Sequence, residues 1–146
     1  MSYKKILLGI DIDGQAPPLI KLATLTPSFR HVRLALAREK DHPHGERTDG
    51  YDLLVPLDAE GRLDPAEWKT HQAACRVRRF RPGEQDRIGQ LRRKPGGRWY
   101  FDYAAGEKDD EIGFRLGEER FVPGEYVSVS SDGTMHTYQV TLVERP

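Results

Sequence analysis

Short runs of alternating apolar and polar residues, separated by turn-forming residues, recur along most of this 146-residue chain. One such run is FRHVRLALAR at 29–38, which places Val32, Leu34 and Leu36 on one side of an extended chain. A period of two residues is typical of a strand with one buried face. The pattern predicts a mostly β protein, a small antiparallel barrel or sandwich. The length suits a single β-rich domain covering residues 1–146.

The clearest hairpin is expected at 125–143, where Asp132 and Gly133 separate two alternating runs. Asp-Gly favours a two-residue turn between antiparallel strands. Counting outward from that turn predicts three facing pairs: Ser131 with Thr134, Val129 with His136, and Val127 with Tyr138.

One short helix is expected at about residues 65–74. Asp64 is suited to the N-cap, Pro65 to the first helical position and Glu67 to the first turn. Further strands are predicted at 6–13, 51–57, 75–80, 89–94, 98–103 and 111–116. The exposed face of the first of these would carry Asp11 and Asp13.

Charge and cysteine content limit the function classes. The formal net charge is zero with 32% charged residues, so an electrostatic partner must be recognised by a local patch. Cys75 is the single cysteine, which excludes an internal disulfide and a cysteine-built zinc site. A cytoplasmic location is therefore expected. Gly9 and Asp11 interrupt the N-terminal apolar run, so no membrane association is expected.

A basic segment followed by aromatic residues lies between residues 76 and 103. The residues expected to form a binding surface are Arg76, Arg78, Arg79, Arg92, Arg93, Arg98, Trp99 and Tyr100. Guanidinium groups bind phosphate in two-point fashion and aromatic rings stack on bases. The segment predicts binding of an anionic partner such as single-stranded nucleic acid, or of an acidic protein surface. Alternatively, these arginines pair with carboxylates in the same sheet, and Trp99 belongs to the core.

The loop at 39–49 contains a His-x-His pattern. In an extended chain His42 and His44 project to the same side, which suits a shared metal ion. The pattern resembles the metal-binding motif of cupins, in which a nearby glutamate and a later histidine complete the site. The resemblance implies a divalent metal bound by His42, His44, Glu46 and His136, although cupins have more residues between the second histidine and the glutamate. The alternative is a solvated loop rich in turn-forming residues.

The sequence taken as a whole favours a non-enzymatic binding module that uses the basic segment and needs no cofactor. Two alternatives remain open at this stage. One is a metal-dependent, cupin-like barrel enzyme, and the other is a protein–protein adaptor that uses its segregated charges.

Overall fold

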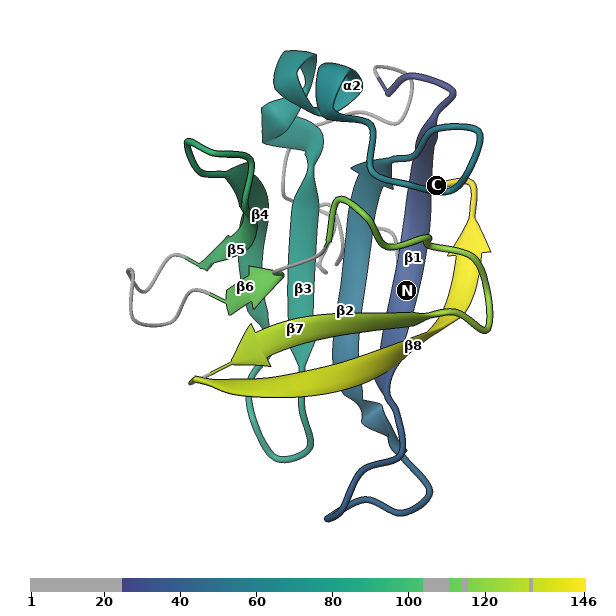
Figure 1. Cartoon of the computed structure of the whole chain (residues 1–146), viewed down its shortest axis with the longest axis vertical. Helices are drawn as coiled ribbons and strands as arrows, with labels where there is room; N and C mark the ends of the chain where they lie inside the picture. The colour runs from purple at the N-terminus through teal and green to yellow at the C-terminus, as the bar shows by residue number, and fades with distance from the viewer. Residues whose placement is uncertain (1–24, 104–110, 114–115, 132) are drawn as a thin grey trace, which may run out of the picture.

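The computed structural model describes residues 25–103, 111–113, 116–131 and 133–146. Eight strands form a closed barrel in which each strand lies next to its neighbours in sequence (Figure 1). The strands are β1 (Phe29–Leu36), β2 (Glu46–Pro56), β3 (Arg76–Phe80), β4 (Arg87–Arg93), β5 (Trp99–Tyr103), β6 (Glu111–Gly113), β7 (Tyr126–Ser131) and β8 (Thr134–Glu144). The prediction of a mostly β antiparallel fold is confirmed, and the structure decides for the barrel over the sandwich.

Closure of the barrel depends on pairing between its first and last strands. β1 pairs antiparallel with β8 from His31 opposite Glu144 to Leu36 opposite Tyr138. This contact joins residues about a hundred positions apart in the chain, so no local pattern specifies it. Because β1 and β8 pair with each other, neither strand presents an open edge at which another chain could add a strand.

Inward-facing side chains of alternate strand positions fill the barrel. On β1, Val32 and Leu34 are buried, as the alternation predicts. On β5, the buried residues are Trp99, Phe101 and Tyr103, while the residues between them are half-buried. The aromatic row therefore belongs to the core.

The hairpin of β7 and β8 has the predicted register. Ser131 faces Thr134, and the two pairs expected beyond them also form. Asp132 and the strand expected at 6–13 lie outside the described residues. The register matters because it places His136 and Tyr138 on the inner face together with Val129.

A short helix covers one end of the barrel. Helix α2 (Pro65–Thr70) begins after Asp64, whose side chain accepts hydrogen bonds from the Ala66 and Glu67 amides. The predicted helix is divided at His71, after which a 3-10 turn, η2 (Gln72–Ala74), follows. The ring of Trp68 packs edge-on against Trp99 and thereby anchors the helix to β5.

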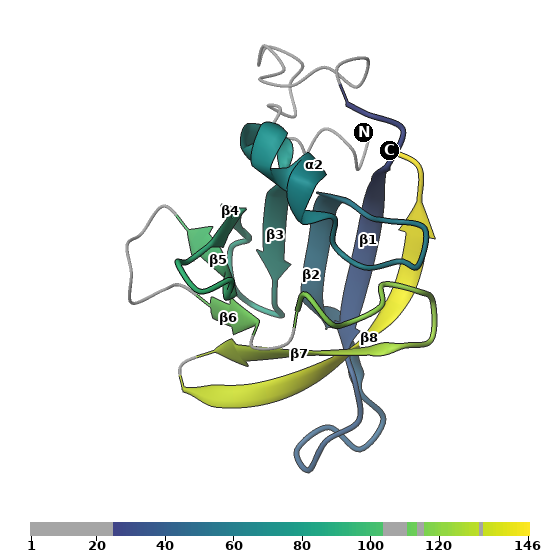
Figure 2. The same cartoon turned by 45° about the horizontal axis from the view of Figure 1, so that its top comes forward.

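The two ends of the barrel differ. Helix α2 lies over one end, and the loop between β1 and β2 projects from the opposite end (Figures 1 and 2). The tip of the β4–β5 hairpin lies toward the α2 end (Figure 1). Among the described residues, no helix has the length and apolar character needed to cross a membrane.

Gly50 permits the close approach of β2 to β1, and its substitution provides a test of the barrel packing. A Cβ atom there would lie 1.9 Å from the Leu34 carbonyl oxygen, which is backbone and cannot rotate away. We expect Gly50→Ala to lower the free energy of unfolding by about 3 kcal/mol. Gly83→Ala is the matched control. Its Cβ would meet nothing within 4 Å, and only its positive φ of 74° should cost about 1 kcal/mol. Urea unfolding of both variants checks the difference, and equal losses would contradict this account.

Candidate functional site

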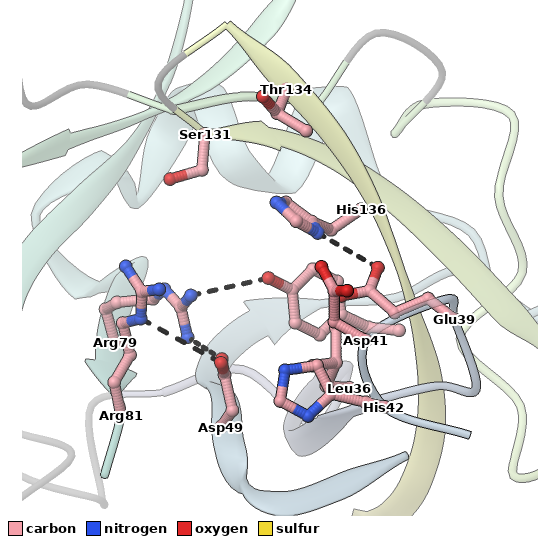
Figure 3. Close-up of a pocket in the computed structure, with 11 residues that line it drawn as sticks. Leu36, Glu39, Asp41, His42, Asp49, Arg79, Arg81, Ser131, Thr134 and His136 are labelled. Carbon is pink, nitrogen blue, oxygen red and sulfur yellow. Dashed lines mark hydrogen bonds and ion pairs between the residues drawn. The ribbon is translucent and has the colours of Figure 1, made fainter. Parts of the chain in front are cut away.

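A cavity of about 270 Å³ opens at the end of the barrel from which the β1–β2 loop projects (Figure 3). Its wall is formed by that loop, by β2 and β3, and by the β7–β8 hairpin. The lining residues are Leu36, Glu39, Asp41, His42, Asp49, Arg79, Arg81, Ser131, Thr134, His136 and Tyr138. Most of these side chains are polar or charged.

Arg79 is the buried cation of this cavity. Alternation along β3 places it on the same inner face as Val77, and its side chain is only 2% exposed. One terminal nitrogen donates to Asp49 Oδ1 at 2.6 Å, and also to the Gly50 and Phe80 carbonyls. The other donates to the Tyr138 hydroxyl at 3.4 Å. The positive charge of Arg79 is therefore stabilised by the Asp49 carboxylate and by the dipoles of two backbone carbonyls and one hydroxyl.

Glu111 provides a second buried carboxylate deeper in the barrel. Its Oε1 atom accepts hydrogen bonds from the hydroxyls of Tyr51 at 2.9 Å and Tyr103 at 2.7 Å. Its Oε2 atom lies 3.7 Å from Arg79 Nε and 3.6 Å from a terminal nitrogen of Arg87. Two cations and two tyrosines therefore surround this carboxylate, which makes its burial tolerable.

Burial shifts the ionisation of this network. Burial, together with Glu111, raises the pKa values of Tyr51 and Tyr103 well above the usual value of 10.0. Burial raises the pKa of Tyr138 to about 12. Burial by itself lowers the pKa of Arg79, but Tyr51, Tyr138 and Asp49 outweigh it and hold that pKa above its usual value. The tyrosines are thus neutral and Arg79 is charged at physiological pH.

Two atoms of this network have no hydrogen-bond partner among the described residues. They are Arg79 Nε, a donor, and Glu111 Oε2, an acceptor. Their separation of 3.7 Å is too long for a hydrogen bond. A buried polar atom without a partner is costly, so such atoms mark places where water or a ligand group is needed.

Charged pairs also lie at the rim of the cavity. His136 Nδ1 lies 3.1 Å from Glu39 Oε2, and both side chains are about 30% exposed. Arg81 Nε lies 3.8 Å from Asp49 Oδ2, so Asp49 is shared between Arg79 and Arg81. Figure 3 shows these groups converging on one space from different strands.

The arginines expected to form one binding surface lie on different faces. Arg79 points into the barrel, whereas Arg78 lies on the outer face against Asp52 and 2.6 Å from Asp86. Burial opposes the charge of Arg78, but hydrogen bonds to Asp52 raise its pKa overall. Arg76 is half-buried and donates to the Ala73 carbonyl. Alternation along β3 thus separates Arg79 from Arg76 and Arg78, so the three cations do not form one surface.

The β4–β5 hairpin retains a basic tip. Arg92 is held by Asp102 at 2.5 Å. Arg93 lies over the ring of Trp99 and Lys94 over the ring of Tyr100. The remaining expected contacts are Arg98, which is exposed, Trp99, which is buried, and Tyr100, which is half-buried. Because the Trp99 indole is buried, Tyr100 is the aromatic residue of this set whose ring is partly exposed.

The expected metal ligands are only partly brought together. His42 and His136 line the cavity, whereas His44 is exposed on the β1–β2 loop and Glu46 begins β2. Within residues 25–103, 111–113, 116–131 and 133–146, no three His, Cys, Asp or Glu side chains are grouped so that they could hold a metal ion. Of the two histidines in the His-x-His pattern, only His42 lines the cavity. The residue that contacts His136 is Glu39.

No protein-family model, no curated protein and no solved structure matches this chain. The site is therefore interpreted from its own geometry.

Several residues of the cavity network were not among the residues expected to form a site. Asp49, Tyr51, Tyr103, Glu111, Tyr138 and Glu39 belong to it. For Tyr138 a signal existed, because the hairpin register already placed it on the inner face with His136. Position i+2 from Val77 likewise indicated that Arg79 points inward. For Glu111 the pattern was misleading, because alternation in the strand expected at 111–116 favours Ile112 as the buried residue, whereas the structure buries Glu111 and leaves Ile112 half-buried.

The buried tyrosines predict a loss of stability at alkaline pH. A group whose pKa is higher in the folded state stabilises that state fully below its unfolded pKa, here about 10. That contribution is lost as the pH rises from about 10 toward the pKa values that the tyrosines have in the folded state. Each tyrosine contributes up to about 1.4 kcal/mol per pH unit to the fall in the free energy of unfolding.

Urea unfolding between pH 8 and pH 11 measures this dependence. Tyr103→Phe removes one buried phenol and should make the fall shallower. Tyr126→Phe is the control, because Tyr126 is 57% exposed and should leave the slope unchanged. Equal slopes for the two variants would show that the buried phenols do not carry the effect.

Proposed function

We propose that this protein binds a small, uncharged, polar molecule in the cavity at the β1–β2 loop end of the barrel. The observation that carries the proposal is that the charged groups of the inner cavity wall pair with one another, whereas Asp41 at the rim is exposed and keeps its hydration. Asp49 lies against Arg79 and Arg81, and Glu39 lies against His136. A ligand with a net charge would have to displace one of these pairs or lose its hydration without a counter-charge.

The size of the cavity supports a small ligand. Pockets for drug-sized molecules usually measure about 300 to 1,000 Å³, and this cavity of about 270 Å³ is smaller than that range. Barrels of eight strands have room for filled interiors or for one small ligand. The mouth of a barrel is also a common location for a binding site.

The chemistry of the wall supports a ligand that both donates and accepts hydrogen bonds. Ser131 and Thr134 bring hydroxyls, which act in both ways. Arg79 adds guanidinium N–H groups to the cavity wall. At the rim, Asp41 is exposed and negative, which disfavours an anion further. Hydroxyl, amide and carbonyl groups on the ligand meet these requirements.

A matched pair of small molecules tests the proposal. Lactamide and lactate share one carbon skeleton and differ in charge. In an amide NMR titration, we expect lactamide to shift the signals of Asp49, Arg79, Ser131 and Tyr138 at millimolar concentration. Lactate should shift them much less, because both arginines of the wall already have a carboxylate neighbour. Shifts from lactate as large as those from lactamide would contradict the proposal.

Filling the cavity provides the control on location. Ser131→Leu adds bulk to the wall and should abolish the lactamide shifts. Ser128→Leu makes the same change on the outer face of β7 and should leave them intact. Retention of binding in Ser131→Leu would place the ligand elsewhere.

A second candidate function is supported by the basic tip of the β4–β5 hairpin. We infer that this tip contacts the phosphates of an anionic partner such as single-stranded nucleic acid. Among the described residues, Arg93 and Lys94 contact aromatic rings and no carboxylate. Their charges are therefore not neutralised within that part of the chain, and Tyr100 beside them offers a ring for stacking.

Removal of these two charges tests the second function. We expect Arg93→Ala with Lys94→Ala to weaken binding of a labelled single-stranded oligonucleotide, measured by fluorescence anisotropy. The slope of log affinity against log salt should fall by about 0.7 for each phosphate that the protein no longer neutralises. Arg38→Ala with Lys40→Ala is the control. Both residues are exposed in the β1–β2 loop, which projects from the end of the barrel opposite to the β4–β5 tip. An equal loss in both double variants would indicate non-specific attraction, and no loss in either would remove the hairpin from consideration.

A further inference from the structure

His136 and Glu39 have the arrangement of a general base and the carboxylate that orients it. The Nδ1 atom of His136 lies 3.1 Å from Glu39 Oε2. When Nδ1–H donates to a carboxylate, the ring is held in the tautomer whose Nε2 atom carries the lone pair. Glu39 lies in the β1–β2 loop and His136 on β8, so only the closed barrel brings them together.

The second ring nitrogen of His136 faces the cavity. In Figure 3, Glu39 lies on one side of the ring, and the other nitrogen points toward the space between Ser131 and Arg79. Within the described residues, the hydrogen bond to Glu39 is the polar contact that the His136 ring makes. The basic atom is thus exposed to whatever occupies the cavity.

The guanidinium of Arg79 lies in the cavity wall further along the inner face of β8 from His136. His136 and Tyr138 are two residues apart on the inner face of β8, a separation of roughly 7 Å along the strand. The hydroxyl of Tyr138 accepts from Arg79, whose cation lies in the cavity wall.

We propose that His136 is a catalytic base that removes a proton from the α-carbon of a small, uncharged hydroxycarbonyl compound bound in the cavity. The inference rests on the proposed function, because it requires that the cavity accepts a neutral polar ligand. Glu39 is a positioning residue that orients the imidazole and stabilises its protonated form.

The proton transfer balances without any further reactant. His136 Nε2 takes the proton from the α-carbon, and the C–H electron pair becomes the carbon–carbon double bond of an enolate. The π pair of the carbonyl moves onto its oxygen, and the imidazolium formed in the same step keeps the bound pair neutral overall. The imidazolium then returns the proton to the same carbon and restores both partners. In deuterated water the returned atom is a deuteron, so the cycle appears as hydrogen exchange.

Hydroxyacetone in deuterated water tests the inference. Loss of its α-proton signals is followed by ¹H NMR in the presence of the full-length protein. We expect exchange at least about 100-fold faster than with the same concentration of imidazole, which is the lower range of general-base catalysis at a positioned group. His136→Gln should reduce the rate to that of the buffer. His44→Gln is the control, because His44 is an exposed histidine of the same loop outside the cavity wall.

Glu39→Gln separates positioning from a purely structural role. The amide removes the carboxylate that holds the imidazole, so the exchange rate per folded protein should fall. Glu39→Asp keeps a carboxylate and should recover part of that rate, whereas a purely structural role would lower only the amount of folded protein. A rate per folded protein that is unchanged in Glu39→Gln would overturn the role assigned to Glu39.

The amide spectrum of the same sample distinguishes the two proposals. Shifts of the cavity amides with hydroxyacetone, but exchange no faster than with imidazole, would overturn the catalytic role and leave the binding function standing. No shifts and no exchange would overturn both. Fast exchange that persists in His136→Gln would show that the base is another residue and would overturn the assignment.

Discussion

The burial of the Arg79 guanidinium inside a closed barrel determines much of the rest of this structure. A buried cation must be matched by opposite charge and by hydrogen-bond acceptors. Asp49, the Gly50 and Phe80 carbonyls and the Tyr138 hydroxyl meet that requirement. Because these groups occupy one end of the interior, apolar side chains do not fill it, and a polar cavity remains there.

The barrel therefore has two chemically distinct ends. At one end Trp68 and Trp99 pack together, and helix α2 covers the core. At the other end the interior is polar and opens between the β1–β2 loop and the β7–β8 hairpin. The polar network next to this cavity retains unsatisfied hydrogen-bonding capacity among the described residues. Such a division is common where a rigid barrel supports a binding site at its mouth.

Local patterns predicted most of the elements that the structure describes, but few of the residues that line the cavity. The register from Ser131 with Thr134 outward followed from one Asp-Gly turn, and the cap at Asp64 followed from its own neighbourhood. The basic segment was interpreted as one surface, but alternation sends Arg78 outward and Arg79 inward. The His-x-His pattern drew attention to His44, whereas the group that contacts His136 is Glu39. Composition identified the right kinds of residue but could not identify their partners.

The sequence by itself determined most of the described strands, the start of the short helix and the register of the last hairpin, because each depends on residues close together in the chain. Only the tertiary structure decided that the sheet closes through β1 and β8. Closure then brings together Arg79 and Glu111, and His136 and Glu39, which are far apart in sequence. A charge acquires its role from the neighbours that the fold places around it, and those contacts are long-range.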